Sequence, residues 1–84
     1  MSDDNLTVEE RQMLEKAAES GGHFSIRGLL PAEMTHAADV ALALHRLGFM
    51  NEPFIQKTFE KGTSIIEQIT VGLTDEGREY LAES

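Results

Sequence analysis

The stretch 49–71, FMNEPFIQKTFEKGTSIIEQITV, decides the fold, because its apolar residues leave helical spacing and its centre favours a turn. Two β-prone segments flank residues 61–63 (KGT), and this arrangement predicts a β-hairpin. The expected register pairs Phe59 with Ile65, Lys57 with Glu67, and Ile55 with Ile69. A slip of one residue would break all three pairs, so the sequence predicts one register.

Upstream of the hairpin, the sequence predicts a helix followed by a short strand. Thr7 and Glu10 have the spacing of a capping box, so the first helix is expected from Val8 to about Ser20. Gly21-Gly22 ends this helix, because glycine adopts the left-handed conformation at low cost. Residues 23–26 (HFSI) alternate in polarity and predict a short strand or an extended link.

Two helices are expected between this strand and the hairpin. Pro31 fits the first turn of a helix and damages an interior, so the second helix either covers residues 28–34 with irregular geometry or begins at Pro31. Leu29 and Leu30 would face inward. Thr35 is the candidate cap of a third helix that covers residues 36–47.

One further helix is expected after the hairpin. Thr74 is its candidate cap, and Asp75 and Glu76 lie in its first turn, where the helix dipole favours negative charge. Tyr80 and Leu81 are the residues expected to pack inward from this helix.

Length and composition favour one small domain. The chain has 84 residues and no cysteine, and its 15 acidic and 7 basic residues give a formal net charge of −8. We expect a flexible acidic N-terminus at residues 1–6 and one domain at residues 7–84. The sequence has no apolar run of about 18 residues and no basic-then-apolar start, so we expect a cytoplasmic protein without membrane contact.

The order of elements resembles the winged helix-turn-helix fold, an α+β class: helix, short strand, helix, helix, two-stranded wing, helix. Residues 43–50 (ALHRLGFM) resemble the end of a recognition helix that enters a wing. Residues 69–83 (ITVGLTDEGREYLAE) resemble a second wing strand and a closing helix. Small MarR-like regulators and phage-associated winged-helix families share such an ending.

The resemblance implies that DNA contacts would come from the third helix and the wing. The candidate residues at matching positions are Arg27, His36, Arg46, Lys57 and Lys61. The acidic residues concentrate at the two ends of the chain, and residues 21–50 carry equal numbers of acidic and basic groups. The nearly neutral reading face weakens the objection that the net negative charge raises against DNA. Most of the side chains that read base edges are missing, however, and the acidic faces suit a basic partner, so a protein partner is favoured over DNA.

No motif in the sequence predicts catalysis or a cofactor. The G-x-S-x-G, P-loop and G-x-G-x-x-G patterns do not occur. His36 and Asp39 are three residues apart on one predicted helix, but no H-x-x-x-H spacing accompanies them, so no metal site is expected. We therefore expect a non-enzymatic protein without metal or cofactor.

Surplus apolar residues indicate a binding surface instead. Leu42, Phe54 and Ile66 are left over after one apolar stripe of the third helix and one face of the hairpin are assigned to the core. They are the candidate contacts to a protein partner or to a second copy of the chain.

The sequence thus predicts a small acidic winged-helix module that binds a protein partner. By analogy, small acidic phage-encoded inhibitors of host machinery or of bacterial defence systems act in this way. The alternative is a dimeric DNA-binding transcriptional regulator that uses the third helix and the wing.

Overall fold

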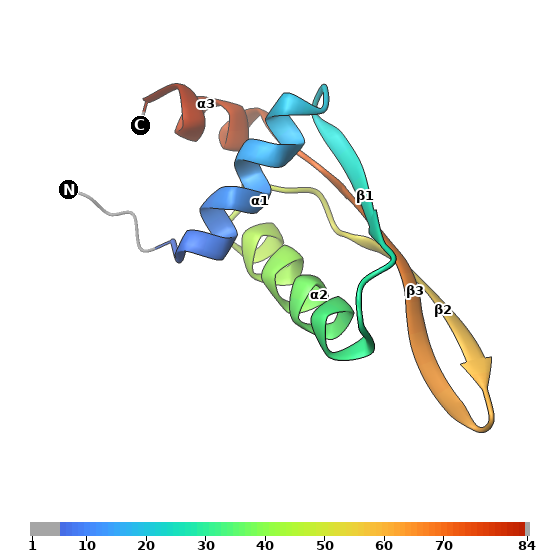
Figure 1. The fold of residues 1–84 in the computed structure, drawn as a ribbon. Coiled ribbons are helices and arrows are strands. Elements are labelled where there is room, and N and C mark those ends of the chain that lie inside the picture. The colour runs from blue at the N-terminus through green and yellow to red at the C-terminus, as the bar shows by residue number, and fades with distance from the viewer. Residues whose placement is uncertain (1–5, 84) are drawn as a thin grey trace.

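The computed structural model describes residues 6–83, which form three helices and one three-stranded antiparallel sheet (Figure 1). In chain order the elements are α1 (Val8–Glu19), β1 (His23–Arg27), α2 (Pro31–Arg46), β2 (Phe54–Glu60), β3 (Thr63–Gly72) and α3 (Asp75–Glu83). The fold is therefore a small α+β domain with the expected hairpin between its last two helices.

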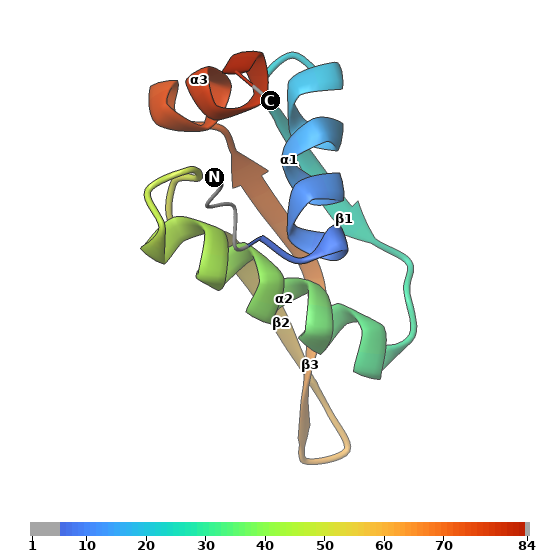
Figure 2. The same cartoon turned by 90° about the vertical axis from the view of Figure 1, so that its left-hand side faces the viewer.

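The sheet has the order β1-β3-β2, so the longest strand, β3, lies in the centre. The helices lie on one side of it, and the end of the β2–β3 ribbon projects beyond them in both views (Figures 1 and 2). Helix α2 packs against β3 and β1, and α1 packs against α2, β1 and α3. One sheet face thus carries the core and the other lies open.

The core is formed by apolar residues from α1, α2, β3 and the segments that connect them. Its buried members are Leu14, Ala17, Met34, Ala38, Val40, Ala41, Leu44, Met50, Ile69, Val71 and Leu73. Burial of these side chains is the main stabilising contribution, because each large one contributes roughly 1.5–3 kcal/mol when it leaves water.

The first helix begins as predicted. The Thr7 hydroxyl accepts a hydrogen bond from the Glu10 amide at 3.1 Å, and the Glu10 carboxylate accepts one from the Thr7 amide at 2.9 Å. Most of the expected flexible segment 1–6 lies outside the described residues. Its last residue, Leu6, packs against the core and therefore belongs to the domain.

Helix α2 corrects the prediction of two helices between β1 and the hairpin. It runs without a break from Pro31 to Arg46. Of the two alternatives for the second helix, the start at Pro31 is confirmed, because Pro31 occupies the first turn, where its missing amide hydrogen costs no intrahelical bond. Thr35 caps no new helix, because its hydroxyl donates to the Pro31 carbonyl at 3.1 Å inside α2. Residues 28–52 thus contain one helix, and no helix-turn-helix pair.

The start of α2 leaves the preceding loop exposed. Glu33 accepts a hydrogen bond from the Leu30 amide at 3.3 Å, which fixes the first turn at Pro31. Leu29 and Leu30, expected to face inward, lie in the loop and are 46% and 67% exposed.

The hairpin has the predicted register at its base and a different one at its tip. Ile55 pairs with Ile69 as expected, but Lys57 pairs with Ile66 and Phe59 with Ser64. The change of register lies between Gln56 and Lys57, and it leaves Glu67 without a partner on β2. The predicted pairs Lys57–Glu67 and Phe59–Ile65 are therefore wrong.

Helix α3 closes the end of the domain. The Thr74 hydroxyl accepts from the Gly77 amide at 3.1 Å and donates to the Gly48 carbonyl at 2.6 Å, so this residue caps the helix as predicted. Gly77 allows the close approach, because a Cβ there would overlap the Phe49 carbonyl oxygen. The expected packing residues Tyr80 and Leu81 contact the core.

Candidate functional site

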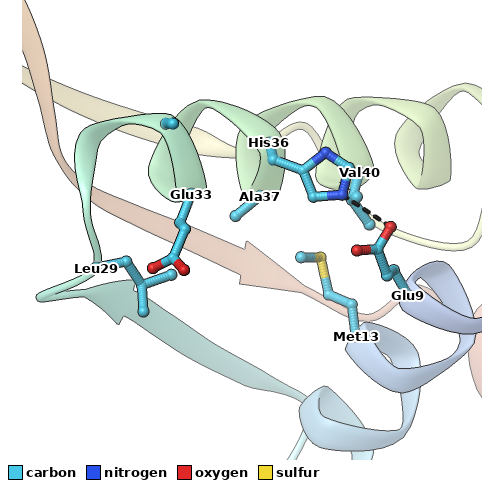
Figure 3. A pocket seen from close by; sticks show the side chains of 8 residues that line it. Glu9, Met13, Leu29, Glu33, His36, Ala37 and Val40 are labelled. Atoms are coloured by element: carbon cyan, nitrogen blue, oxygen red, sulfur yellow. Dashed lines mark hydrogen bonds and ion pairs between the residues drawn. The ribbon is translucent and has the colours of Figure 1, made fainter.

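An apolar groove lies between α1, α2 and the loop that precedes α2. Its volume is about 370 Å³. Its lining residues, which define the α1–α2 groove, are Glu9, Met13, Leu29, Ala32, Glu33, His36, Ala37 and Val40. Figure 3 shows Met13 reaching from α1 toward Ala37 on α2. Leu29 comes from the loop on the other side of the groove (Figure 3).

A second hollow continues the groove along α1. Its volume is about 320 Å³, and it shares Glu9, Met13, Leu29 and Ala37 with the first. Phe24 and Ile26 from β1 extend its apolar lining, and Gln12 and Lys16 line it from α1. The two hollows therefore form one continuous surface around the Met13 side chain, which has the flexibility to adapt to different shapes.

Two carboxylates mark opposite ends of the first hollow. Glu9 stands at one end and Glu33 at the other (Figure 3). His36 Nε2 lies 2.8 Å from a Glu9 carboxylate oxygen and links α2 to α1. The hydrogen bond to Glu9, its charge, and the more distant charge of Asp39 raise the pKa of His36 above 6.5, so protonation strengthens this link.

The structure places two of the three apolar residues expected to form one patch, Phe54 and Ile66, on opposite faces of the sheet. Phe54 pairs with Thr70 on the open sheet face and is 62% exposed. Ile66 packs against the core on the opposite face. Leu42 is half-buried on α2. The shift of register explains this outcome, since it turns Ile66 inward and leaves Ile65 outside the core cluster.

The five residues expected to contact DNA do not all lie on one surface. Lys57 and Lys61 lie on the ribbon, and Arg27 ends β1 opposite Gln68. Arg46 lies in the last turn of α2, about 20 Å from the first turn at a helical rise of 1.5 Å per residue. Pro31 and Thr35, at the start of α2, line a hollow together with Lys57. Arg46 therefore lies at the opposite end of α2 from Lys57. His36 is engaged by Glu9 in the middle of the helix.

The exposed side of α2 is not basic. Glu33, His36 and Asp39 are exposed along it, and Arg46 is the positive residue at its end. Such a face offers few donors to phosphate or to guanine edges.

No metal-binding cluster of three histidine, aspartate or glutamate side chains occurs within residues 6–83. In the same range, no helix has the length and apolar character needed to cross a membrane.

The sequence does not predict this groove, because one of the two helix alternatives places Leu29 inside a helix and both leave its side chain facing inward. The sequence signal that indicates a loop at this point is the glycine and the proline that flank the two leucines. Gly28 has a φ of +84°, and Pro31 starts α2, so the two leucines between them lie in a loop.

Comparison with protein-family models, with curated proteins and with solved structures finds no match to this chain.

Proposed function

We propose that this chain is a non-enzymatic module of the winged-helix type that binds a protein partner through the α1–α2 groove. The observation that carries the proposal is an uncovered groove between α1 and α2 whose lining is mainly apolar. Apolar grooves bordered by polar residues are typical of sites that receive side chains from a partner.

Exposed leucine supports the assignment to a protein partner. Leu29 is 46% exposed at the edge of the groove, and Met13 and Val40 lie behind it. A partner side chain seated there would remove apolar surface from water on both sides of the contact. The winged-helix assignment is supported by the sheet order β1-β3-β2 and by the projecting ribbon, and it departs from that type in having one helix where two are usual.

The test uses the tagged chain as bait in lysate of the source organism, with and without nuclease treatment, followed by titration calorimetry with the purified candidate. We expect a protein that binds directly. Leu29→Ser should weaken its binding about tenfold, which corresponds to about 1.4 kcal/mol. Phe59→Ser is the matched control, because Phe59 is 76% exposed on the ribbon, away from the groove. Retention of nuclease-sensitive nucleic acid alone would contradict the proposal.

DNA binding is the second candidate, and the projecting ribbon favours it. Lys57 and Lys61 lie on this ribbon, and Arg27 lies at its base. If DNA is the ligand, Lys57→Gln and Lys61→Gln should weaken duplex retardation and reduce its salt dependence, whereas Arg46→Gln should not. An absence of retardation at low salt would eliminate this candidate.

A further inference from the structure

We infer that the α1–α2 groove binds a basic segment of a partner protein that carries two large apolar side chains. This inference rests on the proposed function and adds the chemistry of the partner. It follows from the shape of the groove and from the charges at its rim.

The shape indicates two apolar anchors. The two hollows share the lining of Met13 and Leu29, and each adds its own apolar wall. Val40 and Ala32 belong to the first hollow, and Phe24 and Ile26 belong to the second. A segment with two apolar residues on one face can therefore fill both hollows, and the Met13 side chain between them can shift to fit.

The rim indicates positive charge on the partner. Glu9 and Glu33 stand at the two ends of the first hollow, and each uses one carboxylate oxygen in the contacts to His36 and to the Leu30 amide. The other oxygen of each can accept a hydrogen bond from an incoming lysine or arginine. His36 also lines the groove, where it pairs with Glu9, and Lys16 is the single lysine or arginine among the described lining residues.

The charge of the whole chain favours the same partner. The formal net charge of −8 attracts basic segments over a distance and opposes the approach of a second copy. It also opposes nucleic acid at this rim, since phosphates would meet carboxylates. The occupant that fits both features is a basic segment with apolar anchors, and neither a homodimer nor DNA fits them.

The test begins with three synthetic helical peptides of equal length. One carries leucine on one face and lysine on the other, the second replaces lysine by glutamate, and the third replaces leucine by glutamine. Amide chemical shifts of the wild-type chain report where each peptide binds. We expect saturable shifts at Glu9, Met13, Leu29 and Ala37 with the leucine–lysine peptide, and at least tenfold weaker binding of the other two.

Two pairs of charge variants then test the rim. Glu9→Gln with Glu33→Gln should weaken the leucine–lysine peptide severalfold and flatten its salt dependence. Glutamine retains a carbonyl acceptor for the contacts within the domain. The matched control, Glu60→Gln with Glu79→Gln, makes the same change in net charge at exposed sites away from the groove and should leave affinity nearly unchanged. Thermal unfolding verifies that each variant is folded.

Several results would overturn the inference. One such result is a set of chemical-shift changes confined to the ribbon, and another is equal binding of the leucine–glutamate peptide. A third is a dimer detected by light scattering, together with concentration-dependent shifts at the groove residues of the free chain. If the natural partner requires Leu29 but the leucine–lysine peptide does not bind, the partner chemistry is wrong and the proposed function stands. If nucleic acid is the only ligand recovered, the proposed function itself fails.

Discussion

The base and the tip of the β2–β3 ribbon obey different constraints. At the base, Ile55 pairs with Ile69, and Ile69 is fully buried in the core. At the tip, Glu60 pairs with Thr63 around a two-residue turn, and Phe59 is 76% exposed. The base is held by burial, whereas the tip is held by backbone pairing and by its turn.

The turn at the tip explains the local register. Lys61 and Gly62 have φ values of 52° and 77°, and positive values at both positions characterise the tight turn that suits a twisted hairpin. This turn fixes the pairing of Phe59 with Ser64, and the core fixes that of Ile55 with Ile69. The two registers differ by one residue, and the unpaired Glu67 accommodates the difference.

The largest expected effect compares two isoleucines on the same strand. Ile69→Ala should lower the free energy of unfolding by about 2–5 kcal/mol, because Ile69 is fully buried at the base. Ile65→Ala, on the tip side of the bulge, should cost clearly less, since Ile65 is half-buried outside the core cluster. Urea unfolding measures both. Equal losses would show that the tip is packed as firmly as the base.

A smaller effect is expected at the turn. Gly62→Ala should destabilise the chain by roughly 1–2 kcal/mol, because its φ of 77° is unfavourable for a residue with a Cβ. No steric clash contributes, since nothing lies within 4 Å of the added Cβ. Gly62→Asn is the control and should lose less, because asparagine tolerates this conformation. Thermal unfolding of the two variants separates the conformational cost from other effects.

Removing the bulge should have a still smaller effect. Deletion of Glu67 gives the base and the tip one common register and keeps Ile66 and Ile69 on the inner face. The expected change in stability is about 0.5 kcal/mol or less, as for surface changes that touch no core contact. Deletion of Thr70 is the control, because it would force Ile69 or Val71 out of the core. A loss from the Glu67 deletion as large as that of the control would contradict this account.

The smallest effect concerns the exposed contact between α1 and α2. The pKa of His36 is raised by its hydrogen bond to Glu9, so the contact stabilises the fold fully below the ordinary histidine pKa of 6.5. This contribution is lost as the pH rises through the raised value. Stability of the wild type relative to His36→Gln should therefore decrease from acidic to mildly alkaline pH. An NMR titration of the imidazole that gives a pKa at or below 6.5 would refute the contact.

Much of the local structure followed from short patterns in the sequence. The Thr7–Glu10 box, the Thr74 cap and the glycine turn at Gly62 act over three or four residues, so their partners are visible in the sequence. The pairing of Ile55 with Ile69 also followed, because both are apolar positions in the alternating segments.

The candidate site was less accessible to sequence reasoning. Phe54 is exposed, but Ile66 packs against the core on the other face of the sheet. One unpaired residue reverses the faces of a strand, and the alternation pattern alone did not reveal it. The groove is built from α1, β1, a loop and α2, so its lining residues are distant in the chain.

The sequence by itself determined the acidic charge, the caps of α1 and α3, the turn and the order of most elements, because each depends on composition or on neighbours a few residues apart. The tertiary structure decided three features: the fusion of two expected helices into α2, the bulge in the ribbon, and the groove around Met13. These depend on how separate elements pack. Pro31 permits a helix to begin there, but packing of the whole helix on the sheet favours its unbroken continuation to Arg46.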